Sequence, residues 1–225
     1  MSFIISVSDH ILFEDEFVLV MNKPAGLMVE PDRNGYPNLL QQVRKYLKNN
    51  LQAGDEVYLQ HIHRLDRPVS GVILFAKQRS VLKNLSEQFA ERRVKKYYQA
   101  LTYHAPSQPN GKLQNWLRKE KKRAVIYDQE IEFAEKAILN YEVTTFAENQ
   151  FLWTIELHTG KYHQIRAQLA YIGCPIIGDL LYGSNAQYQP DCIALHAHQL
   201  IFFHPITNEQ MVITKEHAFN LSLNR

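Results

Sequence analysis

Residues 61–77 read HIHRLDRPVSGVILFAK and join a charged turn directly to a run of apolar residues. Within this stretch Asp66 stands between Arg64 and Arg67, and the Ser70-Gly71 pair follows. The apolar run has the length and β-branched content of a buried strand. A carboxylate beside two guanidiniums is expected to be charged, because opposite charges nearby favour the ionised form. The stretch therefore predicts a strand preceded by a polar turn, which is either a reactive carboxylate site or an ordinary surface turn with a local ion pair.

Further runs rich in β-branched and aromatic residues recur along the chain, and Gly, Pro, Asn or charged residues bound each of them. They predict strands of one sheet at residues 17–23, 71–77, 97–103, 139–146 and 151–158. Apolar residues at helical spacing predict helices at 37–49, at 79–91 and from about His163 onward. Because strands and helices do not alternate strictly, an α+β fold is favoured over a doubly wound α/β fold.

Length and composition favour one compact domain over residues 1–225. The chain has 225 residues, of which 45% are hydrophobic, and contains no long Gly/Ser-rich or Pro-rich linker. One compositional shift lies at about 104–136, where a basic cluster precedes an acidic one, and we interpret it as an excursion from this domain. The formal net charge is only +2, so any contact with nucleic acid must use a local basic patch.

Other features of the sequence limit the class to which the protein can belong. Cys174 and Cys192 are too few for a disulfide scaffold and lack the paired spacing of a zinc site, so a reducing cytoplasm is predicted. No signal peptide is evident, and no apolar run approaches the roughly 20 residues that span a bilayer. The histidine pairs 61/63 and 196/198 are interpreted as structural, and the phosphate-loop, dinucleotide and serine-hydrolase motifs are absent from the sequence. We therefore expect no metal, no cofactor and no membrane contact.

A second informative stretch, ELHTGKYHQIRAQLAYIGCPIIGDLLYG, covers residues 156–183. Thr159-Gly160 ends a predicted strand, and the helix that follows carries Lys161, His163 and Arg166 near its N-terminal end. Cations beside unpaired backbone donors favour an anion site. The alternative is an ordinary strand-turn-helix whose basic first turn is solvated.

Five segments, in order, resemble the motifs of the RluA-type RNA pseudouridine synthases. They are VMNKPAGLMV at 20–29, HRLDRPVSG at 63–71, VKKYYQA at 94–100, the stretch at 158–183 and LHAHQLIFFHP at 195–205. The resemblance covers nearly the whole chain. It implies a curved, mixed, largely antiparallel sheet flanked by helices, and an isomerase that cleaves the glycosidic bond of a uridine, rotates the base and rejoins it through carbon without a cofactor.

The resemblance also implies roles for particular residues. Asp66 matches the catalytic aspartate, Tyr98 the active-site tyrosine, and Arg166 the basic partner of that aspartate. Arg64 matches the arginine that helps to displace the target base in base flipping. Whether the carboxylate attacks the anomeric carbon or removes a ribose proton stays open.

This chain departs from the family pattern at three places. Val69 stands where Thr is usual, Lys161 where Arg is usual, and Ala167-Gln168 where relatives have a small residue and His. The residues expected to bind RNA are mostly cations, in the motifs or in the basic cluster, whose alternative reading is a solvated surface. They are Lys23, Arg64, Arg67, Lys119, Lys121, Lys122, Arg123, Lys161 and His163.

Two classes of function remain on sequence grounds. The first is an RNA-modifying isomerase acting on structured RNA, a stem-loop of rRNA or tRNA, in the cytoplasm and without a required protein partner. The second is a non-catalytic RNA-binding or ribosome assembly factor. A glycosidase-like hydrolase is a weaker third reading, because the motifs supply no second carboxylate. The intact set of Asp66, Tyr98 and Arg166 favours the isomerase, since a pure binder gains nothing from a carboxylate facing phosphates.

Overall fold

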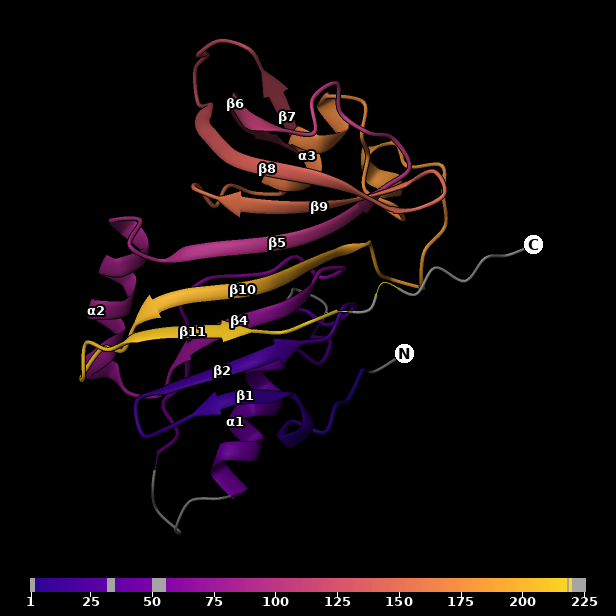
Figure 1. Cartoon of the computed structure of the whole chain (residues 1–225). Coiled ribbons are helices and arrows are strands. Elements are labelled where there is room, and N and C mark those ends of the chain that lie inside the picture. Colours follow the sequence, from indigo (N-terminus) through magenta and orange to yellow (C-terminus); the bar gives the residue numbers. More distant parts are fainter. Residues whose placement is uncertain (1–2, 32–34, 50–55, 218, 220–225) are drawn as a thin grey trace. The chain divides into compact units, whose positions relative to one another are not determined.

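The computed structural model of the protein describes residues 3–31, 35–49, 56–217 and 219 (Figure 1). Its chain divides into two compact units. The first comprises the described residues up to Val94 together with Gln199–Lys215, and the second comprises Lys95–His198 and the described residues from Glu216 onward. The single catalytic domain over residues 1–225 stays a prediction.

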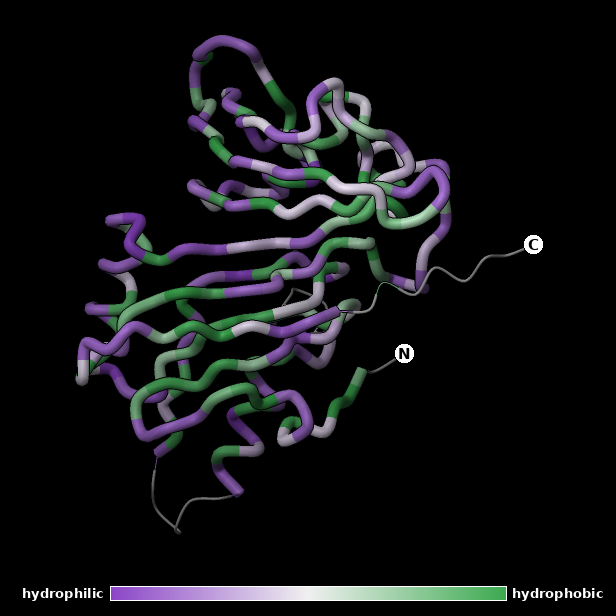
Figure 2. The backbone as a smooth tube through the Cα atoms, in the orientation of Figure 1, coloured by the Kyte–Doolittle hydropathy of each residue, from purple (hydrophilic) through white to green (hydrophobic). Residues whose placement is uncertain are grey.

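The first unit is built around two buried strands. β2 (Val18–Lys23) pairs antiparallel with β4 (Ser70–Ala76), and Lys23 lies opposite Gly71. All seven residues of β4 are buried, as the apolar run in the sequence predicts. The other strands of this unit are β1 (Ile11–Glu14) beside β2, β3 (Gln60–His61) beside β4, and the end of β10 (Leu195–Phe203) beside β11 (Gln210–Thr214). Figure 2 shows hydrophobic stretches along these strands.

Two helices belong to the first unit. α1 (Leu39–Asn49) begins two residues later than predicted, because Asn38 caps it: the Asn38 side-chain oxygen accepts the backbone N–H of Gln41 at 3.0 Å. α2 (Arg79–Ala90) confirms the second predicted helix and packs its buried Val81 and Leu85 against the strands. A short 3-10 turn, η1 (Ser8–His10), precedes β1.

The second unit is a run of antiparallel strands in the order β5-β9-β8-β6-β7. These strands are β5 (Lys95–Thr102), β6 (Asn110–Glu120), β7 (Arg123–Tyr127), β8 (Glu135–Ala147) and β9 (Gln150–Leu157). The strands predicted at 97–103, 139–146 and 151–158 are confirmed by β5, β8 and β9. The helix α3 (Gln164–Tyr171) packs against β7 and β6, and η2 (Leu180–Tyr182) follows it.

The stretch at about 104–136 contains a β-hairpin that composition did not reveal. β6 pairs with β7 on one side and with β8 on the other, so these residues extend the sheet of the second unit. Charged and polar side chains fill most outward positions of β6, and only Leu117 among its eleven residues is fully buried. A strand with so few buried positions lacks a clear apolar alternation.

A mixed, mostly antiparallel sheet with three helices confirms the predicted α+β class. None of the helices in the described part of the chain is long and apolar enough to span a bilayer.

One acidic turn gives the first unit a pH-dependent element. The Asp15 carboxylate accepts the backbone N–H groups of Phe17 and Val18 at 2.8 and 2.7 Å, and its other oxygen lies 2.8 Å from His204 Nε2. Burial alone would raise the pKa of Asp15, but the two backbone donors and His204 outweigh it and lower the pKa below its ordinary value of 3.8. The ionised carboxylate therefore stabilises the folded first unit.

We expect Asp15→Asn to lower the melting temperature at pH 7 by about 2 °C or less, because solvent reaches this carboxylate and screens its interactions. A group whose pKa is lowered by folding contributes stability above its ordinary pKa, and that contribution is lost as the pH falls through the folded value. The difference between wild type and Asp15→Asn should therefore be constant above about pH 5 and vanish in acid. Thermal unfolding from about pH 3 to 7 measures it, and a difference that grows in acid would contradict this assignment.

Candidate active site

The turn that carries Asp66 lies between β3 and β4. The backbone N–H of Val69 donates to the carbonyl oxygen of Asp66 at 3.0 Å and closes the turn. Leu65 and Val69, on either side, are 7% and 2% exposed and anchor the backbone in the core, whereas Asp66 is only partly buried. Val69, the departure from the family pattern, therefore serves packing here, and the turn closes through backbone atoms.

Lys23 supports this turn from the interior. Its side chain is 0% exposed, and its ammonium donates to the carbonyl oxygens of Pro24, Leu27 and Arg67 at 2.9, 2.7 and 3.2 Å. Gly26 adds two bonds to Arg67: its N–H donates to the Arg67 oxygen at 2.8 Å, and its carbonyl accepts from Arg67 Nε at 3.0 Å. Burying an ammonium is costly unless its donors are satisfied, as they are here. Lys23 therefore holds the backbone of Arg67, the residue after Asp66. The sequence suggested that Lys23 contacts RNA directly, and its burial argues against such a contact.

Arg64 lies at the surface of the first unit, with its side chain 64% exposed, and its guanidinium pairs with Glu30. The other Glu30 oxygen lies 3.4 Å from His61 Nε2. Burial lowers the pKa of His61, and the charge of Glu30 opposes that shift. Sequence reasoning missed Glu30, because its partner lies 34 residues away. Arg67 is also exposed, so both arginines that flank Asp66 face solvent.

Arg166 on α3 makes a buried, bidentate salt bridge in the second unit. Its Nε and Nη2 donate to the two carboxylate oxygens of Asp179 at 2.7 and 2.9 Å, and the two side chains are 6% and 1% exposed. Gly178 precedes Asp179 with φ +86°, and a Cβ there would lie 2.5 Å from Tyr188 Cβ, so only glycine fits. The sequence named Asp66 as the partner of Arg166 and assigned no role to Asp179. The contact with Asp66 stays a prediction.

Tyr98 lies on β5 with its side chain 8% exposed. Side chains alternate along a strand, so Tyr98 shares a face with Ala100 and with Ile155, which is opposite it on β9. The neighbouring Tyr97 points to the other face, where burial and the charge of Glu156 raise its pKa. The two tyrosines therefore lie on opposite faces of β5, and the role of Tyr98 stays a prediction.

The basic cluster forms the β6–β7 hairpin, and its cations have different surroundings. Arg118 is engaged by Glu120 and Tyr127, through Nη2 contacts of 2.6 and 3.0 Å. The Lys119 ammonium lies 4.5 Å from the centre of the Tyr162 ring. The two residues of the turn, Lys121 and Lys122, are exposed, and among the described residues neither ammonium has a partner. The guanidinium of Arg123 lies 5.3 Å from the ring centre of Tyr182.

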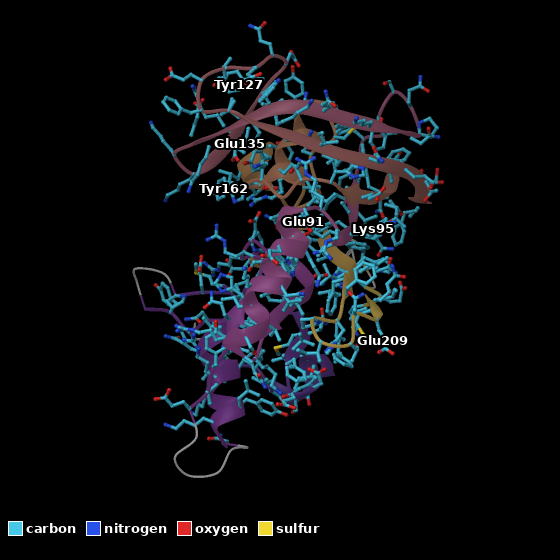
Figure 3. The ribbon with its side chains drawn as sticks, turned by 90° about the vertical axis from the view of Figure 1, so that its left-hand side faces the viewer. Glu91, Lys95, Tyr127, Glu135, Tyr162 and Glu209 are labelled. Carbon is cyan, nitrogen blue, oxygen red and sulfur yellow. The ribbon has the colours of Figure 1, made fainter. Side chains whose placement is uncertain are left out.

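The start of α3 is enclosed by aromatic side chains. His163, the residue before the helix, has φ +52° and stacks on Tyr162 with ring centres 3.8 Å apart. Its Nδ1 lies 3.1 Å from the Tyr182 hydroxyl. Lys161 pairs with Glu135, which is labelled beside Tyr162 in Figure 3. The cations at this helix start therefore have partners within the second unit, unlike the solvated basic turn of the alternative reading.

The predicted site residues thus fall into two groups. The first unit brings together Lys23, Arg64, Asp66 and Arg67, and the second contains Tyr98, Lys119, Lys121, Lys122, Arg123, Lys161, His163 and Arg166. Sequence reasoning missed Glu30, Asp179 and Tyr182, although the last two lie inside the quoted GDLLYG segment. In the described part of the chain, no three His, Cys, Asp or Glu side chains gather as metal ligands would.

Comparisons with known proteins define the class of this fold and site. A family model described as RNA pseudouridylate synthase matches residues 17–171. An uncharacterized RNA pseudouridine synthase of Aquifex aeolicus is 32% identical over an alignment that covers 92% of this chain and 69% of that protein. The dual-specificity RNA pseudouridine synthase RluA of Escherichia coli is 32% identical over 208 residues, covering 89% of this chain and 90% of that protein. Human RNA pseudouridylate synthase domain containing 4 has the same fold, with a TM-score of 0.77 at 23% identity over 94% of this chain and 89% of that one.

The protein is therefore an RNA-modifying isomerase rather than a non-catalytic RNA-binding factor. It belongs to the RNA pseudouridylate synthase family, and the family-model match together with the similarity to RluA confirms the resemblance found in the sequence. Its activity is the conversion of uridine in RNA to pseudouridine.

Proposed function

We propose that Asp66 is the catalytic aspartate of this reaction, with Tyr98 and Arg166 as the tyrosine and arginine that act with it. The observation that carries the proposal is the construction of the Asp66 turn. Arg67, the residue after the carboxylate, accepts from the buried Lys23 ammonium and from the Gly26 N–H, and its Nε donates to the Gly26 carbonyl oxygen. A carboxylate that must meet an anomeric carbon or a ribose proton needs such a fixed backbone. The joint action of residues from the two units rests on family membership.

We propose further that the target uridine leaves its stack to react. A base inside a helix is out of reach of a carboxylate, and extruding it costs a few kcal/mol. Exposed Arg64 can fill the gap in the stack. The ring of Tyr98 is 8% exposed, and we propose that the flipped base stacks on its exposed part.

We propose that the protein acts in the cytoplasm, because Cys174 and Cys192 are free cysteines.

The proposed substrate is a stem-loop of ribosomal or transfer RNA, recognised without a protein partner. Loop bases can be splayed out and read more cheaply than paired ones. The test has two stages: pseudouridine is mapped in total RNA from cells with and without the gene, and turnover is then measured on a stem-loop of about one helical turn and on the full-length RNA carrying the same site. We expect similar kcat/KM for both. Modification of the full-length RNA or a ribosomal particle alone would overturn recognition through the local stem-loop.

The hairpin turn gives a sharper prediction about RNA binding. Lys121 and Lys122 are exposed cations at the turn, whereas Arg118 is engaged by Glu120. Replacing both lysines with Ala should weaken RNA binding and reduce the slope of log K against log salt by about 0.7 to 0.9 for each phosphate that the lysines neutralise in the wild type. Filter binding or fluorescence anisotropy from about 50 to 300 mM salt measures the slope.

Arg118→Ala is the matched control for this measurement. It removes one positive charge from the same hairpin, but a charge already paired with a carboxylate. We expect its slope to stay close to that of wild type. An unchanged slope in the double lysine variant would contradict the prediction and show that the two lysines are a solvated basic surface that does not contact phosphates.

A further inference from the structure

Tyr182 joins the basic hairpin to Arg166, and neither the sequence nor the family comparison assigned it a role. Its side chain is 6% exposed and packs in a small core with Leu117 of β6, Ala124 of β7 and Ala167 of α3. Small side chains at both alanines leave room for the ring between the hairpin and the helix. Tyr182 thus touches the element expected to hold RNA and the element that carries Arg166.

The ring of Tyr182 restrains the guanidinium of Arg166 in a direction that Asp179 does not. Asp179 binds two nitrogens along one edge of the guanidinium plane. The Arg166 Cζ lies 5.1 Å from the centre of the Tyr182 ring, so an aromatic face also covers the cation. An edge contact alone lets the plane tilt about the line of its hydrogen bonds, and the ring opposes that tilt. Cation–π attraction is strongest at desolvated sites, and both side chains are buried.

The hydroxyl of Tyr182 serves the hairpin instead. It accepts the backbone N–H of Ala124 at 2.7 Å and lies 3.1 Å from His163 Nδ1. Because the oxygen accepts from Ala124, its own proton can be donated to the imidazole, which leaves the His163 proton on Nε2. Burial raises the pKa of Tyr182, while the Ala124 N–H and the charge of Arg166 oppose that shift. The hydroxyl therefore links Ala124, the second residue of β7, to His163, the residue before α3.

We propose that Tyr182 is a positioning residue with two separable functions: its ring sets the orientation of Arg166 for the chemical step, and its hydroxyl holds the basic hairpin in the position in which it binds RNA. The proposal rests on the proposed function, in which Arg166 acts with the catalytic aspartate. It predicts that loss of the hydroxyl alone raises KM, whereas loss of the whole side chain raises KM and also lowers kcat, because the ring contacts Arg166 as well as Arg123 of the hairpin.

Steady-state kinetics on an RNA that the wild type modifies will test the two functions. Tyr182→Phe should raise KM about fivefold and leave kcat within about twofold of wild type, because it removes only the hydroxyl and its hydrogen bonds to Ala124 and His163. Tyr182→Leu should lower kcat about 30-fold, the effect of removing a desolvated cation–π interaction. Tyr171→Phe is the matched control: it removes a tyrosine hydroxyl bonded to Asp128 in the same unit, and both constants should stay within about twofold.

Two further variants separate this proposal from the role of Arg166. Arg166→Lys should lower kcat strongly, and adding Tyr182→Leu to it should cost less than about a further twofold, because the ring acts through the guanidinium. Effects that multiply in the double variant would overturn the proposal, as would a Tyr182→Leu kcat close to wild type or an equal kcat loss in Tyr182→Phe. Unchanged kcat in Arg166→Lys would instead overturn the role of Arg166 itself.

Thermal unfolding is measured for each variant to confirm that it folds. If Tyr182→Leu does not fold, Tyr182→Met replaces it, because the flexible methionine side chain can fill the space of the ring.

Discussion

Asp66→Asn is expected to reduce turnover by at least about a thousandfold while RNA affinity stays at or above that of wild type. The substitution removes the carboxylate that we propose attacks the anomeric carbon or takes the ribose proton. It also removes a negative charge that repels phosphates, so binding should not weaken. Since Asn has nearly the same shape and the turn is closed by the backbone bond from Val69 to residue 66, the local structure should persist.

Single-turnover measurement of pseudouridine formation, with a parallel binding assay, checks this expectation. Asp9→Asn is a suitable control, because it removes an exposed carboxylate from the same unit outside the site. The control should keep wild-type turnover. Residual activity of Asp66→Asn within about tenfold of wild type would contradict the assignment of Asp66.

Asp179→Ala is expected to destabilise the second unit by about 3–5 kcal/mol, because it leaves the buried Arg166 guanidinium without its two-pronged partner. The free energy of unfolding should fall by a similar amount in a urea titration followed by tryptophan fluorescence, since Trp153 is buried in this unit. Turnover should fall with it, because Arg166 is no longer held along one edge.

The double variant Arg166→Met/Asp179→Leu separates stability from catalysis. Replacing both charges of a buried pair with apolar side chains of similar size is often neutral for stability, so much of the lost free energy should return. Turnover should not return, because no guanidinium remains. A destabilisation below about 1 kcal/mol in Asp179→Ala would show that the pair contributes little to the fold.

Much of this protein follows from local sequence patterns. The strand after Asp66 was predictable because seven consecutive residues suit a fully buried strand, and β4 is buried at every position. The helices from about Arg79 and His163 followed from apolar spacing, and α1 was misplaced only at its first turn, where Asn38 caps it. The order of five motifs was enough to define the family, and the proposal that Asp66 is catalytic rests on the second of them.

Only the tertiary structure decided which side chains meet. Lys23 was expected to bind RNA, but three carbonyl oxygens, one of them from a residue 44 positions away, accept from its ammonium in the interior. Asp179 pairs with Arg166 across 13 residues, and the Tyr182 hydroxyl meets the Ala124 N–H across 58. Periodicity reports which face of an element is buried, because that depends on neighbours along the chain. The partner of a buried charge depends on how distant segments pack, and since an unpaired buried charge is costly, packing and pairing are settled together when the chain folds.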